Sequence, residues 1–329
     1  MKEFFKDNWK RIIIIVLFFG LCITSVMIGS LSGVTPSALI SRDETAWDVL
    51  LYSRIPRTIA IILSAAGLSV AGLIMQAISR NKFMSPSTSG TTDAAAFGLL
   101  LSFIFLSSQP GIIQTIFAFV FALGSTLLFT SVINRLKIRE AVYVPLLGMM
   151  YGGLISAVTI AVAYRFEVMQ MMSAIGMGSF ARLGNFTVVY IVAAPLFLSV
   201  IYASKFSIIG MGEDFAKNLG LHYNRVVFIG LVIVALISAA TYVSVGHLPF
   251  IGLIIPNMAT SFYGDNIKKS IFDLMIFGAD FVLVCDIFSR LIIHPYEISV
   301  SLTISLVGGI IFMIYLWRGI NGNKSRKTA

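Results

Sequence analysis

Long apolar runs follow one another along the whole chain, separated by short groups of charged residues, glycines and prolines. A helix that crosses a bilayer needs about 20 consecutive apolar residues. Runs of about that length predict ten membrane spans, over residues 12–29, 57–78, 88–106, 112–133, 141–163, 186–204, 226–245, 248–263, 271–292 and 298–317. The third is rich in Ser, Thr, Gly and Ala near its start, and the eighth contains Pro249 and Pro256. The pattern predicts an all-α, polytopic integral membrane protein with about ten transmembrane helices.

The composition supports this class and excludes two others. Of the 329 residues, 57% are apolar and 12% are charged, whereas a soluble domain carries roughly 25% charged residues. The mean hydropathy of +0.92 also excludes a disordered chain. The apolar run that follows residues 1–11 resembles a signal peptide, but it lacks a clean small-x-small cleavage site, so we expect a retained first helix. Because no linker interrupts the chain, residues 1–329 are expected to form one transmembrane domain.

The distribution of basic residues predicts the orientation of the chain. The net charge is +9, from 24 basic and 15 acidic residues. With the N-terminus in the cytoplasm, the predicted inside segments hold all eleven lysines and seven of the thirteen arginines. The opposite orientation would violate the preference of Lys and Arg for cytoplasmic loops. We therefore predict cytoplasmic N- and C-termini, and we interpret the basic excess as loop topology beside lipid rather than nucleic-acid binding.

No set of side chains predicts a metal site. Cys22 and Cys285 both lie in apolar runs, which excludes a disulfide framework and a CxxC site. The three histidines lie in separate predicted loops on both sides of the membrane: His222, His247 and His294. Soft thioethers can bind Cu(I), but methionines also fill gaps in apolar surfaces. We interpret the following residues as an adaptable pathway wall: Met149, Met150, Met169, Met171, Met172 and Met177.

The inside stretch 205–225 predicts a short amphipathic helix between Gly212 and Gly220. Glu213 and Asp214 fall in its first turn, where the helix dipole favours anions. Phe215 and Leu219 lie four residues apart and therefore on one face, which suits docking into a groove of a soluble partner. The alternative is an interfacial helix resting on lipid, which would more often carry Lys and Arg than an acidic start.

Several polar residues fall inside predicted spans. Asp286 and Arg290 are four residues apart, and because unpaired charges are costly at this depth we expect a structural ion pair. Gln76 ends a stripe of small residues (Ala65, Ser69, Gly72) that is typical of tight helix packing, and its side chain either joins that packing or faces a pathway. Asp93, which like Gln76 is a candidate pathway residue, is expected to cap or hydrogen-bond an irregular short helix.

Four sequence blocks, found in the same order as in a known family, carry a resemblance. They are Arg54-Ile-Pro56-Arg57 with the following helix to Gln76, Arg80-Asn81-Lys82-Phe83 and Pro86; Gly212-Glu213 to Leu219-Gly220; Pro249 to Pro256; and Asp286 to Arg290 with Glu297-Ile298. Together with ten spans, they resemble the FecCD-type permeases of ABC importers for ferric siderophores, haem and cobalamin. The blocks cover most of residues 54–317.

The resemblance implies a type II ABC importer permease that has no catalytic residue and binds no cofactor itself. It implies a second permease subunit, identical or a paralogue, together with two ATP-binding subunits and an external siderophore-binding protein. ATP would be used by those partners, and the chain itself has no Gly-x-x-x-x-Gly-Lys-Ser/Thr loop. The permease would lie in the cell membrane and work by alternating access.

The resemblance also implies roles for individual residues. The segment from Gly212 to Gly220 resembles the coupling helix that rests on the ATPase subunit, so Glu213, Asp214 and Phe215 would transmit its motion. Arg54 and Arg57 resemble basic rim residues that meet acidic groups of the binding protein. The alternative for both arginines is snorkelling of the side chain to the membrane interface.

The chain departs from the family pattern at two positions. Asn257 follows Pro256 where the family usually has His, and Ser299 follows Ile298 where it usually has Pro. At these two positions the family pattern does not predict the local geometry of the gate in the transport pathway. The block from Ser79 to Pro86, with Gly90-Thr91-Thr92-Asp93, is most similar to permeases for catecholate-type siderophores.

Two other classes of protein compete with this interpretation. A secondary transporter driven by protons or sodium would use intramembrane carboxylates, and the candidates are Asp93, Asp280, Asp286 and Glu297. A membrane-embedded enzyme would need a catalytic motif, but the chain contains no HExxH and no Asp-rich diphosphate motif. A transport subunit is therefore the preferred prediction.

Overall fold

The computed structural model describes residues 2–28, 44–106, 111–136, 143–182, 187–263 and 267–327. Within these ranges nearly all residues are helical and none belongs to a strand, although Met177 and His247 form one isolated parallel bridge. The elements are α1 (Lys2–Met27), α3 (Glu44–Val49), the π-helical turn η1 (Leu50–Arg54), α4 (Ile55–Ser79), α5 (Thr91–Phe105), α6 (Gly111–Leu136), α7 (Tyr143–Arg165), α8 (Met169–Gly176), the 3₁₀ turn η2 (Phe180–Arg182), α9 (Thr187–Tyr190), α10 (Ala193–Gly210), α11 (Glu213–Asn218), α12 (Tyr223–Val245), α13 (Ile251–Tyr263), α14 (Ile267–Leu291) and α15 (Val300–Lys327). The predicted all-α fold is confirmed.

A helix overlaps each of the ten predicted spans. Five described helical segments are long and apolar enough to cross a membrane, namely Glu44–Ser79, Gly111–Arg135, Tyr143–Arg165, Val188–Gly210 and Tyr223–Val245. Shorter apolar helices cover Arg11–Met27, Thr91–Phe105, Ile251–Thr260 and Val300–Ile314. Pro256 lies inside α13, whereas Pro249 precedes that helix, so only Pro249 marks a break.

The connection between the first two predicted spans is helical in its second half. Residues 29–43 lie outside the described residues, but from Glu44 the chain is helical without interruption through α3, η1 and α4. Pro56 suggests a break because it cannot donate a hydrogen bond inside a helix. The π-helical turn directly before it changes the local bonding pattern. The helix therefore passes the proline and extends one apolar segment to 36 residues.

Helix α4 is the centre of the bundle and packs against α10, α12, α13 and α14. Its small residues allow these close approaches, as the stripe through Ser69 and Gly72 predicts. A Cβ on Gly72 would overlap the backbone of Gly252 in α13, and a Cβ on Gly278 of α14 would overlap the hydroxyl of Ser69. The Ser69 hydroxyl itself donates to the Ala65 carbonyl at 2.7 Å. Backbone contact between α4 and its neighbours thus depends on residues with little or no side chain.

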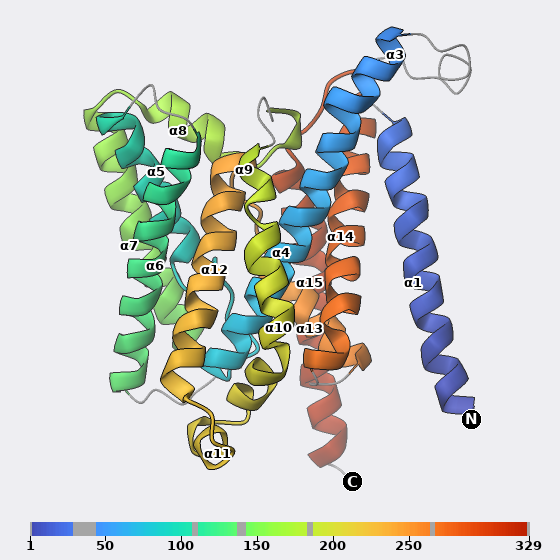
Figure 1. The fold of residues 1–329 in the computed structure, drawn as a ribbon, viewed down its shortest axis with the longest axis vertical. Helices are drawn as coiled ribbons and strands as arrows, with labels where there is room; N and C mark the ends of the chain where they lie inside the picture. The colour runs from blue at the N-terminus through green and yellow to red at the C-terminus, as the bar shows by residue number, and fades with distance from the viewer. Residues whose placement is uncertain are drawn as a thin grey trace.

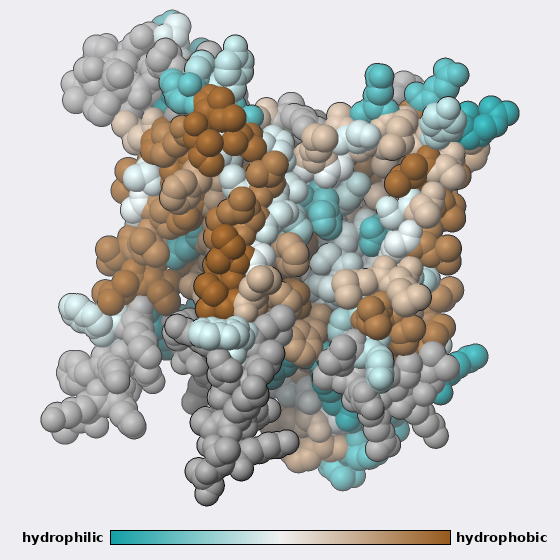
Figure 2. Space-filling model, turned by 180° about the vertical axis from the view of Figure 1, so that it is seen from behind, coloured by the Kyte–Doolittle hydropathy of each residue, from teal (hydrophilic) through white to brown (hydrophobic). Residues whose placement is uncertain are grey.

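The helices stand side by side in a bundle (Figure 1), with α1 at one edge beside α14 and with α5, α6 and α7 at the opposite edge. The start of α1, the end of α15 and the short helix α11 lie at the same end of the bundle. The helices α3 and α8 lie at the other end. Figure 2 shows hydrophobic side chains over the flanks of one face at mid-height, as expected for a surface that contacts lipid.

Candidate functional site

Helix α11 is the short helix that the sequence predicts between two glycines. Gly212 and Gly220 have φ of 118° and 76°, a region that residues with a Cβ rarely adopt. The N–H of Gly220 donates to the Lys217 carbonyl at 2.9 Å, and the N–H of Leu221 donates to the Ala216 carbonyl at 3.0 Å. This pair of bonds is a Schellman motif, which ends a helix at a left-handed glycine. The glycines therefore define both ends of α11.

The outward face of α11 is apolar at its centre. Phe215 is 47% exposed and Leu219 is 56% exposed, whereas Ala216 is buried against the bundle. Glu213 and Lys217 form an exposed ion pair of 2.7 Å, one turn apart. The hydrogen bond and negative charge of Glu213 raise the pKa of Lys217. An uncovered apolar pair beside paired charges is typical of a surface that contacts another protein.

Arg80 links α11 to the end of α4. It ends α4 in the left-handed conformation, with φ of 49°. Its guanidinium lies beside Gly212, since a Cβ added to that glycine would be 3.3 Å from Nη1 of Arg80. Arg80, Glu213 and Tyr223 line one pocket of about 380 Å³, whereas Asp214 is exposed. Sequence reasoning placed Arg80 in a motif but missed this contact, because the two segments are far apart in the chain.

A network of buried charges joins α4 and α14 at the end of the bundle that carries α3. Arg57 donates to Asp286 through Nη2 and to Glu297 through Nη1, each at 2.8 Å. Asp286 also contacts Arg290, the partner that the i, i+4 spacing predicts. The Asp286 side chain is fully buried. Because both carboxylates have cationic partners, the network is a structural connection between these elements.

Two arginines also bind the end of α1. The last carbonyls of a helix have no partner within it and attract cations. Nη1 of Arg54 donates at 3.1 and 2.7 Å, and Nη1 of Arg290 donates at 2.8 and 2.7 Å. The acceptors are the carbonyls of Val26 and Met27 for Arg54, and of Ser25 and Ile28 for Arg290.

Both arginines, which the resemblance assigns to the outer rim with snorkelling as the alternative, are largely buried and bonded within the chain. Arg54 is 7% exposed, and the side chain of Arg57 is 12% exposed. Carboxylates and carbonyls that are remote in the sequence reach both guanidinium groups, and no local pattern indicates them.

Gln76 and Asn257 hold one loop carbonyl together. The amide of Gln76 donates to the Lys82 carbonyl at 2.9 Å, and the amide of Asn257 donates to the same oxygen at 2.7 Å. Gln76 also lines a pocket of about 400 Å³ with Arg80 and Lys82. Ser299, the other departure, donates to the Gly178 carbonyl at 2.5 Å. Both departures thus connect a helix or loop to a segment distant in the sequence.

Asp93 lines a separate pocket of about 300 Å³ between α5, α7, α8 and α12. Tyr242 and His247 line the same pocket, together with Met169 and Met172 of the predicted methionine wall. The other four methionines of that wall are exposed on the surface of the described chain: Met149, Met150, Met171 and Met177. The sequence singled out Asp93 but gave no sign that Tyr242 or His247 would join it.

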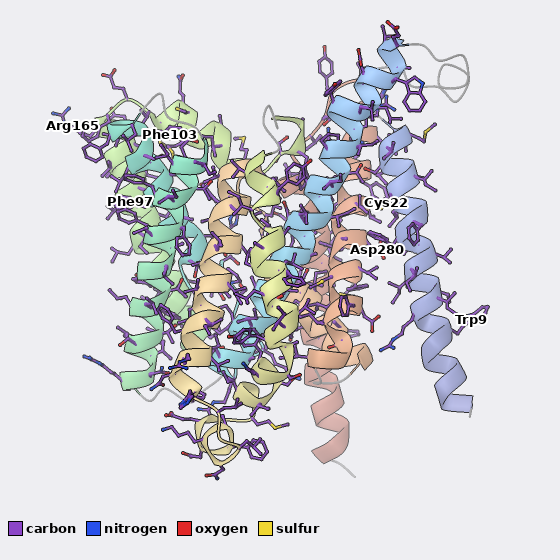
Figure 3. The ribbon with its side chains drawn as sticks, viewed as in Figure 1. Trp9, Cys22, Phe97, Phe103, Arg165 and Asp280 are labelled. Atoms are coloured by element: carbon purple, nitrogen blue, oxygen red, sulfur yellow. The ribbon has the colours of Figure 1, made fainter. Side chains whose placement is uncertain are left out.

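The intramembrane carboxylates fall into two groups. Asp286 and Glu297 are paired with arginines. Asp280, on α14, is 4% exposed and neither of its oxygens has a hydrogen-bond partner among the described residues. Figure 3 shows it on the side of α14 that faces α1, near Cys22. Asp93 and Asp280 are therefore the carboxylates of the competing transporter hypothesis that are not bonded to a cation in the described part of the chain.

Comparison with known proteins decides between these classes. Residues 12–318 match the FecCD transport family. The chain belongs to the FecCD transport family. The predicted resemblance is confirmed, and the chain is a transport subunit of the ABC type rather than an enzyme. Membership of the FecCD family also makes it a multi-pass protein of the cell membrane and implies that ATP is used by partner subunits.

Three FecCD relatives are similar along nearly their whole length. The petrobactin import system permease protein YclN of Bacillus subtilis is 41% identical over 92% of this chain and 96% of its own. The ferric-anguibactin transport system permease protein FatD of Vibrio anguillarum is 36% identical over 93% and 98%. The petrobactin import system permease protein FatD of Bacillus anthracis is 32% identical over 96% and 94%.

Two solved structures share the fold. An inward-facing ABC transporter, assigned provisionally to the metal-chelate type, superposes with a TM-score of 0.76 at 22% identity, covering 92% of this chain and 97% of its own. PsaBC from Streptococcus pneumoniae, solved with a Fab, gives a TM-score of 0.58 at 22% identity, over 78% and 88%. At this identity the likeness concerns the fold alone.

Proposed function

We propose that this chain is the permease subunit of an ATP-driven, binding-protein-dependent importer of a ferric siderophore of catecholate type. The names of its relatives, which import petrobactin or ferric anguibactin, support a siderophore as cargo. The catecholate assignment rests on the block from Ser79 to Asp93. Cargo of this kind arrives with its iron already enclosed, so the permease needs no metal ligands of its own.

The assembly that we propose contains two permease subunits around a central pathway, two ATP-binding subunits and an external binding protein. The ATP-binding subunits would contact α11 at the cytoplasmic end, where α1 begins and α15 ends. The observation that carries this proposal is the exposed apolar pair of Phe215 and Leu219 on a helix closed by two glycines. ATP binding and hydrolysis would bias the bundle between two states, with α11 carrying that bias.

We place the binding protein at the opposite end, which carries α3 and α8. Arg54 and Arg57 would be its basic residues. Because both guanidinium groups are bonded internally, acidic side chains of the binding protein would have to compete with Asp286, Glu297 and the carbonyls of α1. Docking of the binding protein at this end would therefore weaken the ion pairs and hydrogen bonds that hold α1, α4 and α14 together.

An importer driven by ATP and a transporter driven by an ion gradient differ in their energy source. Asp93 and Asp280, which have no cationic partner among the described residues, are the residues that would support the gradient-driven alternative. The complete complex is reconstituted in proteoliposomes, and siderophore uptake is measured with the proton and sodium gradients collapsed. Uptake that continues with ATP and stops without it supports the proposal. Uptake that needs a gradient and no nucleotide would overturn it.

The coupling role of α11 predicts that Phe215→Asp and Glu213→Arg leave the protein inserted but abolish coupled uptake. A charge at Phe215 would disrupt the apolar contact, while Glu213→Arg would reverse the acidic start of the helix. Measuring ATP hydrolysis and uptake in the same proteoliposomes separates coupling from assembly. Asn218→Asp, which adds the same charge as Phe215→Asp at another exposed position of α11, is the matched control. Normal coupled uptake in both Phe215→Asp and Glu213→Arg would refute the role.

A further inference from the structure

The pocket between α5, α7, α8 and α12 combines one acidic group with an apolar wall. Its lining consists of Thr92, Asp93, Ala96, Ser156, Thr159, Ile160, Ala163, Met169, Met172, Ser173, Tyr242 and His247. None of these lining residues is Lys or Arg. The carboxylate of Asp93 therefore faces a cavity of about 300 Å³ without a cation from the described lining.

The neighbours of Asp93 hold it in position and leave its carboxylate open to the pocket. The hydroxyl of Thr91 bonds those of Ser89 and Thr126, at 2.8 and 2.7 Å, which fixes the first turn of α5. On the facing helix α7, Gly152 provides the space for the carboxylate. A Cβ on Gly152 would lie 2.6 Å from Oδ2 of Asp93. A side chain at position 152 would therefore force the Asp93 carboxylate to move from this position.

Two further polar groups of the pocket have no partner within the described chain. Tyr242 is 7% exposed, and no described residue hydrogen-bonds its phenol. His247 lies in the connection between α12 and α13, and burial lowers its pKa, so the imidazole is neutral at pH 7. A neutral imidazole and a phenol both offer acceptor atoms. The hydroxyls of Thr159 and Ser173 are already bonded to carbonyls of their own helices.

This combination fits an organic ammonium group better than a metal ion. Hard cations such as Ca²⁺ take six or more oxygen ligands, and the pocket has one carboxylate. Groups of three His, Cys, Asp or Glu that could hold a metal are absent from the described residues. An ammonium group donates to a carboxylate, a phenol and an imidazole, while its alkyl chain packs on Met169, Met172 and Ile160.

We propose that this pocket binds a protonated amine of the transported ligand, with Asp93 as the counter-charge and Tyr242 as a second acceptor. The proposal deepens the proposed function, because it assigns a cationic group to the cargo. The binding itself requires neither ATP nor partner subunits. The amine site can therefore be disproved while ATP-driven import is upheld, and ATP-driven import can be disproved while the amine site is upheld.

The test measures binding of radiolabelled butylammonium to the full chain in nanodiscs of zwitterionic lipid, with empty nanodiscs as background. We expect saturable binding of about one butylammonium per chain that butanol does not displace. Asp93→Asn should weaken it by tenfold or more. Gly152→Ala should also weaken it, because the new methyl group would lie 2.6 Å from Oδ2 of Asp93 and displace the carboxylate. Tyr242→Phe, which removes only the hydroxyl, should weaken it a few-fold.

Gly153→Ala is the matched control, since a Cβ at that neighbouring position of α7 meets no atom within 4 Å. It should bind butylammonium as the wild type does, and size-exclusion chromatography of each variant verifies folding. Binding that is equal in the wild type and Asp93→Asn would overturn the proposal, as would the absence of saturable binding in the wild type. Displacement by sodium as effective as by butylammonium would also overturn it, because the site would then be one for an inorganic cation.

Discussion

Two clusters of ionisable side chains, one buried and one partly buried, differ in how their charges are paired. At the junction of α1, α4 and α14, Asp286 and Glu297 are both bonded to Arg57, and Asp286 also contacts Arg290. In the pocket between α5, α7, α8 and α12, Asp93 has no cation among the lining residues. A buried charge without a partner is costly, so it persists where it serves a ligand or a reaction. The first cluster therefore holds helices together, and the second is available for binding.

The largest expected effect comes from removing the cation at the centre of the first cluster. Arg57→Ala leaves Asp286 and Glu297 without the donors that lie at 2.8 Å. Breaking a buried ion pair from one side costs about 3–5 kcal/mol. Thermal unfolding in detergent should show this loss, while Arg225→Ala, the same change at an exposed position, should leave unfolding unaltered. Equal unfolding temperatures for both variants would mean that the network contributes nothing to stability.

A smaller effect is expected when one carboxylate in each cluster is neutralised by the same substitution. Asp286→Asn removes the charge that pairs with two arginines, and the expected loss is about 1–3 kcal/mol. Asp93→Asn should change the free energy of unfolding by no more than about 0.5 kcal/mol, because it breaks no ion pair. Its effect should appear in butylammonium binding and uptake instead. If both variants lost the same stability, the distinction between the two clusters would be wrong.

The smallest effect is expected at the exposed pair of α11. Lys217→Ala should leave the unfolding temperature unchanged within error, because water and salt screen exposed charges. The pKa of Lys217 is raised by Glu213. The stabilisation it adds is complete below the ordinary Lys pKa of 10.5 and is lost only as the pH rises through the raised value. Any difference between the unfolding temperatures of the wild type and the variant should therefore stay constant, within error of zero, from about pH 6 to about pH 9.

The sequence predicted the helical fold well because the length of an apolar run is a local property of the chain. The pattern did not predict that the helix begins as early as Glu44, because a π-helical turn lets it pass Pro56. The ends of α11 could be predicted because Gly212 and Gly220 adopt conformations that favour glycine locally. By contrast, nothing near Arg57 indicates Glu297, its partner 240 residues away.

The pocket shows the same limit for a candidate site. Asp93 stands out in an apolar segment, so its position could be noticed without a structure. Gly152, Tyr242 and His247 look like an ordinary helix glycine, a span residue and a loop histidine. Their role depends on how α5, α7 and α12 pack together, which no short-range pattern describes.

The amino-acid sequence by itself determined the class of this protein, its family and the position of the short helix α11, because hydrophobic length and glycine conformation act over one or two turns. Only the tertiary structure decided which intramembrane charges are paired and which face a cavity. The physical reason is that a buried charge is stabilised by groups within a few ångströms, and helix packing brings those groups together from distant parts of the chain.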